Sequence, residues 1–291
     1  MTPPVLPSAQ NEPDASPIRM YFPVGMQPGD YDALQAGADL SSFCLDVDSQ
    51  REHYLTQKRI ITQRPGRGPL RLDSVVAQQA IEAVERFVRA QMRALPAFQS
   101  AGEHLERLSL DDLMMELQED LVIMQLPDGH APPRARALYM HVCFPGGWDP
   151  TQLLGKSVTA LHARVPYEPG FERGERKAQA GLLFQAPAAR YVWSVTAEPT
   201  LDRHPQTPRV SDFQTTPEVF LRVERQIMLP LSEAAEPATS LFLIRTYVYG
   251  RDRLSQAQRE TLVEAISRMS EATLRYKGMF GHEARIIQLL S

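Results

Sequence analysis

The sequence predicts an α+β fold in which helices come first and the strands of an antiparallel sheet mostly follow. Helical spacing of apolar residues is concentrated in the first half, β-branched and aromatic runs are concentrated in the second half, and no βαβ unit repeats. A chain of 291 residues with 43% apolar composition can bury a large core. We see no internal repeat or linker, so we expect one domain over residues 18–291, preceded by a flexible, Pro-rich tail at 1–17.

The first convincing helix is expected at residues 73–95. Apolar side chains recur there at helical spacing, Asp73 or Ser74 can cap the start, and Pro96 ends the helix. The stretch before it, residues 18–68, is expected to be irregular because it is polar and ends in a turn-rich sequence.

The remaining elements are assigned from periodicity and from the turn residues that bound them. In chain order they are a helix at 110–117, a buried strand within 118–126, an alternating strand at 135–144, a short helix at 149–155, strands at 191–197, 218–229 and 240–250, and a final helix at 255–278. The last two strands are joined by an acidic loop and are expected to pair antiparallel. The final helix begins with a capping box of Ser255 and Gln258 and is expected to bury Ile266 and Tyr276.

Charge and cysteine content exclude several classes of protein. The net charge is −4 with both signs interspersed, which argues against a nucleic-acid surface. No apolar run reaches the roughly 20 residues of a membrane span, and the N-terminus lacks the features of a secretory signal. The two cysteines, Cys44 and Cys143, are too few for a disulfide framework and suit the cytoplasm. A [2Fe–2S] cluster of the plant type needs four thiolates, so this chain cannot hold one alone.

Two partial motifs fail on spacing. Gly155-Lys156-Ser157 resembles the end of a phosphate-binding loop, but Pro150 stands where the loop needs its first Gly. His282-Glu283 begins a zinc-protease motif, but the second His is replaced by Ile286. The chain therefore carries neither a P-loop nor a zinc-protease signature.

Three segments together resemble the haem-dependent oxidative N-demethylase family, which includes the haem subunit of dimethylamine monooxygenase. The first, residues 143–166, contains a Phe-Pro turn, a Trp and the pattern His-Ala-x-Val-Pro. The second combines Val-Glu-Arg-Gln in residues 220–228 with Ile-Arg-Thr-Tyr in residues 241–248. The third is the Gln-Glu-Asp strand in residues 117–124, ahead of the Phe-Pro turn. With a weaker match near residues 45–59, the resemblance spans roughly residues 40–255.

The resemblance implies a PAS-like antiparallel sheet core with flanking helices that binds haem b. It implies an enzyme, a monooxygenase-type oxidoreductase that uses dioxygen to remove an N-methyl group from a small methylated amine as formaldehyde. Its electrons would come from NADPH through flavin and iron–sulfur centres on partner subunits. The cysteine count agrees with this expectation. A chain with only two cysteines cannot hold such a cluster, so it would need a reductase partner. The sequence does not determine the oligomeric state, so both a monomer and an oligomer are compatible with it.

By the same resemblance, His162 is the candidate iron ligand. From the residues alone, a single His among apolar neighbours is more often a hydrogen-bonded core residue. His141 is the rival ligand, and Cys143 as a thiolate would suit oxygen activation, although it fits better as a small buried hydrophobic side chain. Arg164 and Lys156 flank His162 and are candidate partners of a haem propionate, with solvent exposure as the alternative.

Strand alternation groups the remaining candidates. Arg222, Glu224 and Gln226 share one face of their strand, and could line a cavity or form the solvated face of an edge strand. On the facing strand, Arg245 and Tyr247 share a face, and an Arg among apolar residues needs a carboxylate. That partner could be Glu224 across the hairpin or a haem propionate. Arg222 and Arg245 are therefore candidate cofactor-binding residues.

The amine substrate is cationic at neutral pH, so its site should hold a carboxylate or an aromatic face. Glu224 and Tyr247 are the candidate catalytic residues, while Trp193 fits the core better. Val192 and Ile227 depart from the family pattern, so the substrate differs from dimethylamine if these positions shape the pocket. Two alternatives to the enzyme stay open, which are a PAS-like haem sensor and a scaffold that has lost haem.

Overall fold

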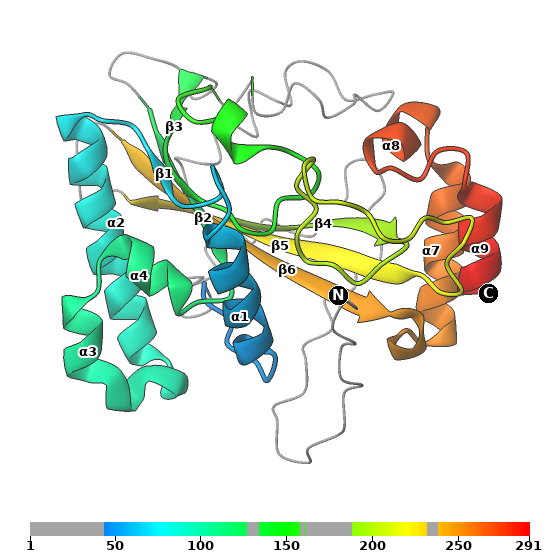
Figure 1. The fold of residues 1–291 in the computed structure, drawn as a ribbon, viewed down its shortest axis with the longest axis horizontal. Helices are drawn as coiled ribbons and strands as arrows, with labels where there is room; N and C mark the ends of the chain where they lie inside the picture. Colours follow the sequence, from blue (N-terminus) through cyan, green and yellow to red (C-terminus); the bar gives the residue numbers. More distant parts are fainter. Residues whose placement is uncertain (1–43, 127–133, 158–159, 161–187, 232–237) are drawn as a thin grey trace.

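The computed structural model describes residues 44–126, 134–157, 160, 188–231 and 238–291. These residues form an α+β fold built on a six-stranded antiparallel sheet (Figure 1). The strands are β1 (Leu70–Arg71), β2 (Asp120–Gln125), β3 (Arg136–His141), β4 (Ala188–Thr196), β5 (Phe220–Leu231) and β6 (Thr239–Gly250). The α-helices are α1 (Arg51–Thr62), α2 (Val75–Ala94), α3 (Gly102–Arg107), α4 (Leu110–Met115), α7 (Gln256–Arg268), α8 (Glu271–Tyr276) and α9 (Glu283–Leu290). The expected tail at 1–17 lies outside the described residues.

The strand order is β1-β3-β2-β6-β5-β4. The expected antiparallel pairing of the last two strands is confirmed, since β5 and β6 pair from Phe220↔Gly250 to Leu231↔Thr239. β2 pairs only with the first half of β6, from Gln125↔Thr239 to Asp120↔Ile244. At the second half of β6, α1 lies beside the strand, where the Tyr54 hydroxyl donates to the carbonyl oxygen of Thr246 at 2.7 Å.

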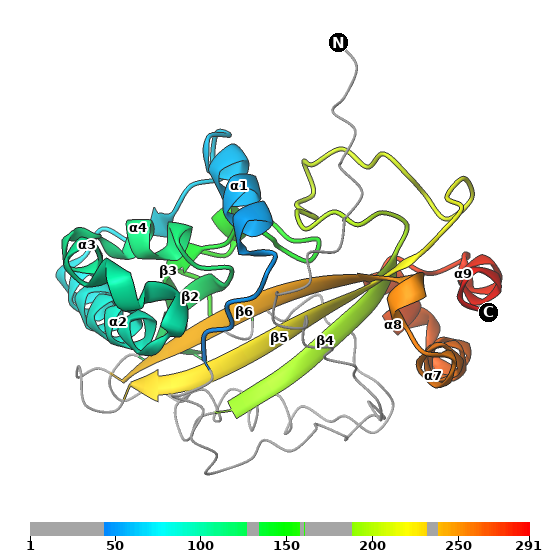
Figure 2. The ribbon, with the colours of Figure 1, turned by 90° about the horizontal axis from the view of Figure 1, so that it is seen from below.

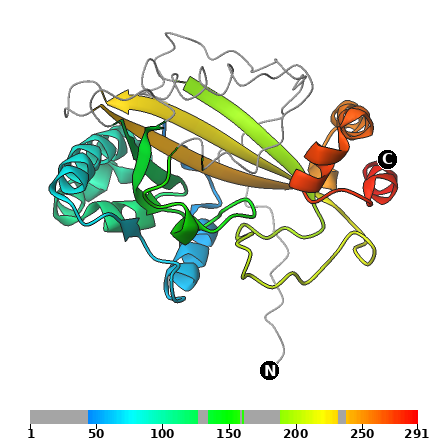
Figure 3. The ribbon, with the colours of Figure 1, turned by 90° about the horizontal axis from the view of Figure 1, so that it is seen from above.

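One face of the sheet carries the main apolar core. Helices α1–α4 gather at the β1–β3 end, and α7–α9 lie at the far end of β4–β6 (Figures 2 and 3). Apolar side chains of α2 and α4 pack on β2, β5 and β6, while those of α7 and α9 pack on β4, β5 and β6. A smaller cluster covers the opposite face of β2 and β3. Its members include Val122, Met124, Met140, Met228, Phe242, Trp148, Leu153 and Leu154.

The expected helix at 73–95 is confirmed almost to the residue. Ser74 is extended and its side chain accepts the N–H of Ala77 at 3.1 Å, so Ser74 rather than Asp73 is the cap. The capping box of Ser255 and Gln258 is also confirmed. These features are local, and local hydrogen bonding fixes them.

Two expectations about helices are wrong. The stretch at 18–68, expected to be irregular, contains α1, which buries only Tyr54, Leu55, Lys58 and Ile61. The expected final helix is broken at Met269, which is extended, and Ser270 caps a separate helix, α8. Tyr276, expected to be buried, is 48% exposed. In the described part of the chain, no helix combines the length and the apolar character that crossing a bilayer requires.

Candidate functional site

A row of polar side chains lies on one face of β5. The Glu224 carboxylate accepts Arg222 Nη2 at 3.2 Å on one oxygen and Gln226 Nε2 at 3.0 Å on the other. The predicted grouping of these three residues is therefore confirmed. The reading as an edge strand is wrong, because β5 lies between β4 and β6. Arg222 and Gln226 are buried, while the Glu224 side chain retains 14% exposure.

Arg222 is held by several acceptors from outside its own strand. Its guanidinium donates to the carbonyl oxygens of Leu201 at 2.9 Å and Phe144 at 2.8 Å, and to the Thr246 hydroxyl at 3.3 Å. With Glu224 as a further acceptor, both terminal nitrogens of Arg222 have partners within the protein. Arg222 thus positions Glu224, and a haem propionate would have to compete with these bonds.

A turn of residues 144–148 closes over the Glu224 carboxylate. A Cβ atom at Gly146 would lie 2.6 Å from Glu224 Oε1, which is too close for any side chain without a shift of the carboxylate. The next residue, Gly147, has a φ of +96°, in the region that favours glycine. The Phe-Pro-Gly-Gly turn and β5, which are distant in sequence, therefore meet at Glu224.

Arg245 and Tyr247 lie on the opposite face of the sheet from Glu224. In the β5–β6 register they stand opposite Arg225 and Val223, and directly opposed residues of an antiparallel pair share a face. Strand alternation places Glu224 on the other face. The predicted site residues on β5 and β6 are therefore divided between two faces and do not form one cluster.

The carboxylate that Arg245 needs is Asp48, from the segment before α1. Arg245 Nη2 donates to Asp48 Oδ2 at 2.9 Å, and its guanidinium stacks over the rings of Tyr54 at 4.0 Å and Tyr247 at 4.7 Å. The Tyr247 hydroxyl donates to Asp46, and burial raises the pKa of Tyr247. Arg245 therefore pairs with Asp48 and not with Glu224, which was one of the two expected alternatives.

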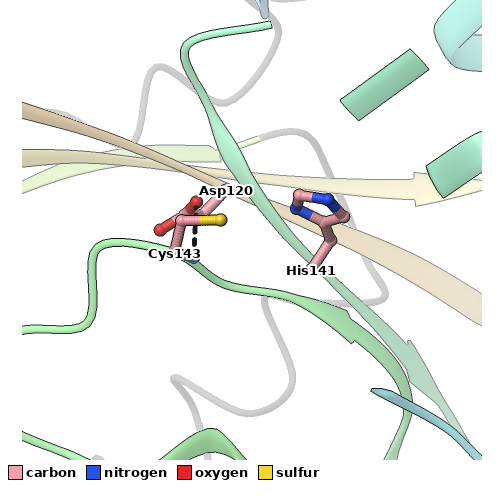
Figure 4. A group of neighbouring side chains, drawn as sticks. All are labelled: Asp120, His141 and Cys143. Atoms are coloured by element: carbon pink, nitrogen blue, oxygen red, sulfur yellow. Dashed lines mark hydrogen bonds between the residues drawn. The ribbon is translucent and has the colours of Figure 1, made fainter. Parts of the chain in front are cut away.

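The rival iron ligands are enclosed by protein. His141 and Cys143 are each 1% exposed, next to Asp120 (Figure 4). Burial, followed by the nearby Lys58 ammonium, lowers the pKa of His141 to about 3, and burial raises the pKa of the Cys143 thiol to about 12. Neither side chain has an exposed surface that a porphyrin could reach in this arrangement.

The predicted iron ligand His162 and its neighbour Arg164 lie outside the described residues, which reach Ala160 in this part of the chain. Lys156 is described and exposed. A further buried histidine, His204, lies with Nε2 3.3 Å from Asp149 Oδ1, and its Nδ1 accepts the N–H of Gln206. His204 is therefore engaged by the protein and is a poor candidate for the iron.

The sequence prediction missed Asp48 and Gly146. Asp48 falls in residues 45–59, where the weaker family match could have drawn attention to it. Gly146 was assigned only to a turn, because its contact with Glu224 joins this turn to a strand that is distant in sequence. Both residues act through contacts that strand alternation does not reveal.

Comparison with known families gives one match over most of the chain. A family model described as haem-dependent oxidative N-demethylase, alpha subunit-like, matches residues 40–287. The match includes all six described strands and the three segments that carry the sequence resemblance. It therefore covers both faces of the β5–β6 pair and the turn over Glu224.

Proposed function

Because the chain belongs to the haem-dependent oxidative N-demethylase, alpha subunit-like family, we propose that it is the haem subunit of an amine-demethylating enzyme. Its substrate is a small methylated amine, which loses one N-methyl group as formaldehyde. The observation that carries this proposal is the half-buried Glu224 carboxylate, which Arg222 and Gln226 hold in place on one sheet face.

Glu224 is the residue that we assign to the amine. Each oxygen of the carboxylate accepts one donor from a neighbouring side chain and keeps capacity for another hydrogen bond. An alkylammonium ion supplies such a donor together with a positive charge. Charge-assisted hydrogen bonds of this kind are stronger than neutral ones. Glu224 would thus bind the ammonium group and orient its methyl groups, while Tyr247 supports Arg245 on the other face.

Haem b is the implied cofactor, and the surroundings of Glu224 suit it chemically. Met228 and Phe242 lie opposite each other in the β5–β6 register, on the same face as Glu224, so apolar and polar side chains adjoin there. Bound haem would supply the iron at which dioxygen is activated. His162 would hold the iron and Arg164 a propionate, since the two described histidines beside the sheet, His141 and His204, are enclosed.

Partner subunits would supply the electrons. The sequence contains two cysteines, both of them buried, which is too few for a plant-type [2Fe–2S] cluster. We therefore propose that electrons pass from NADPH through flavin and iron–sulfur centres on other subunits. Two cysteines that do not form a disulfide suit a reducing compartment, and we place the reaction in the cytoplasm.

We also propose that the sheet is PAS-like and that residues 18–291 form one domain. Leaving out the two-residue β1, the strands numbered in chain order give the order 2-1-5-4-3. The first and last strands are then adjacent at the centre, and this order supports a PAS-like core.

The test compares Glu224→Gln with the wild-type protein, both expressed with a haem precursor. Glu224→Gln should keep the Soret band but raise KM for the amine at least about tenfold, because a hydrogen bond to a charged group contributes about 1.5–3 kcal/mol. Formaldehyde is measured with NADPH, a reductase and a panel of methylated amines. Glu218→Gln, at an exposed position two residues before β5, is the matched control.

Each contrary result has a distinct meaning. A colourless but folded wild-type protein would contradict haem binding and favour a scaffold. A red protein that never forms formaldehyde would favour a haem sensor. An unchanged KM in Glu224→Gln would remove Glu224 from the amine site.

A further inference from the structure

A second cluster of reactive side chains lies away from Glu224, where β2 and β3 meet. Asp120 is the first residue of β2, His141 is the last residue of β3, and Cys143 follows two positions later. One ligand atom from each lies within 4.8 Å of the others, and Figure 4 shows the Cys143 sulfur directed toward the His141 ring. All three side chains are 1% exposed. We propose that these residues form a structural site for a thiophilic divalent cation, with Zn²⁺ as the best fit.

The His141 ring gives an independent reason to expect a ligand. Among the described residues, neither of its nitrogens has a hydrogen-bond partner. An unsatisfied polar group in the interior costs about 1–3 kcal/mol, so such groups are normally paired. A metal ion between His141 and Cys143 would satisfy one nitrogen.

The ligand types and spacing suit zinc. Sulfur, imidazole nitrogen and carboxylate oxygen are the donors that Zn²⁺ takes in proteins, at about 2.0–2.3 Å. Tetrahedral coordination at those lengths puts ligand atoms roughly 3.5 Å apart. Because the ligand atoms lie within 4.8 Å of one another, the side chains would have to approach by at most about 1.3 Å to hold the ion. Water can take the fourth position.

Asp120 is oriented by the backbone. Its two carboxylate oxygens accept the N–H groups of Cys143 at 3.0 Å and Phe144 at 2.7 Å. Hydrogen bonds to a ligating carboxylate fix its direction and are typical of metal sites. They also connect the cluster to the turn that closes over Glu224.

Lys58 is a positive charge that opposes a cation here, and the Arg67 guanidinium, which donates to the Cys143 carbonyl oxygen at 3.2 Å, is already paired with Asp202. Its ammonium lies 3.9 Å from Asp120 Oδ1 and donates to the carbonyl oxygens of Met114, at 2.8 Å, and Glu119. The Asp120 carboxylate and the Cys143 thiolate together balance a divalent ion. With Arg67 balanced by Asp202, Lys58 leaves one excess positive charge, so we expect weaker binding than at a site with four protein ligands.

The experiment measures zinc in the purified full-length haem protein after loading with ZnCl₂ and gel filtration. Elemental analysis should find about one zinc per chain in wild type, the stoichiometry of a single mononuclear site. Cys143→Ser should weaken zinc binding at least about tenfold, as loss of a ligand or its support does. Cys44→Ser is the matched control, because Cys44 is equally buried but belongs to the core against α2.

Cobalt substitution gives a second readout. The difference spectrum between cobalt-loaded and zinc-loaded protein should contain a thiolate-to-cobalt charge-transfer band that Cys143→Ser abolishes and Cys44→Ser retains. His141→Gln should lose zinc in the same way, and if this variant does not fold, Cys143→Ser decides. Wild type that holds no zinc after loading, or Cys143→Ser that binds zinc as wild type does, would overturn the proposal. Neither readout depends on demethylase activity.

Discussion

The two faces of the β5–β6 pair both carry charged side chains, but they use them differently. On the helix-covered face, Arg245 is 1% exposed and is paired with Asp48, which comes from the segment before α1. On the other face, the Glu224 side chain is 14% exposed and is held by neighbours on its own strand. The buried Arg245–Asp48 pair joins distant parts of the chain and stabilises the fold. A supported carboxylate with remaining exposure can also bind a ligand.

The largest loss of stability is expected from removing Arg245 of the buried Arg245–Asp48 pair. Arg245→Leu leaves Asp48 without its cationic partner beside the core, and breaking a buried pair in this way costs about 3–5 kcal/mol. Arg222→Leu leaves unpaired carbonyl oxygens and a partly exposed Glu224, for which we expect about 1–3 kcal/mol. Urea denaturation of both variants measures the free energies of unfolding.

A double variant tests the reason for that difference. In Arg245→Leu/Asp48→Asn, the carboxylate is also removed, so part of the lost stability should return. Equal losses in Arg245→Leu and Arg222→Leu, with no recovery in the double variant, would mean that the two faces do not differ as described.

The sequence predicted what depends on local periodicity. Alternation placed Arg222, Glu224 and Gln226 together, because successive side chains of a strand point to opposite faces. Alternation alone does not say whether Arg245 and Glu224 share a face. That depends on the register of β5 and β6, which is a property of the strand pairing. The pattern alone could not exclude Glu224 as the partner of Arg245.

The partners themselves could not be predicted, because they are distant in the chain. Asp48 and Arg245 are 197 positions apart, and Gly146 reaches Glu224 from the turn after β3. Helix α1 was missed for a related reason. Its buried face includes Lys58, whose ammonium is satisfied by carbonyl oxygens of other elements, so the segment looks polar throughout.

Acid is expected to weaken the support of the Glu224 face. Leu201, whose carbonyl oxygen holds Arg222, precedes Asp202, which forms a buried pair with Arg67 at 2.7 Å. Burial opposes ionisation of Asp202, but hydrogen bonds from Arg67 and Thr207 outweigh it and lower the pKa of the carboxyl. The stabilisation is therefore complete above the unfolded value of about 3.9 and is lost as pH falls through the lower folded pKa.

Thermal unfolding between neutral and strongly acidic pH tests this. Asp202→Asn should unfold at a lower temperature than wild type at neutral pH, and the gap should narrow below about pH 4. A gap between Asp202→Asn and wild type that stays constant down to the lowest pH would rule out the ion pair as the acid-sensitive element.

The smallest effect on stability, and the most specific effect on function, is expected at the turn over Glu224. In Gly146→Ala the new methyl group meets Glu224 Oε1, the far end of a flexible side chain, so the carboxylate shifts at little cost in stability. We expect KM for the amine to rise about tenfold, as loss of a charge-assisted hydrogen bond would produce.

In Gly147→Ala the methyl group meets nothing within 4 Å, but the φ of +96° is unfavourable for alanine. That variant should lose about 1–2 kcal/mol of stability with little change in KM. Neighbouring glycines in one turn would then separate a contact with the carboxylate from backbone strain, as steady-state kinetics and urea denaturation of both variants can measure. The opposite pattern, with KM raised only in Gly147→Ala, would mean that the turn affects the amine through its backbone and that its contact with Glu224 is incidental.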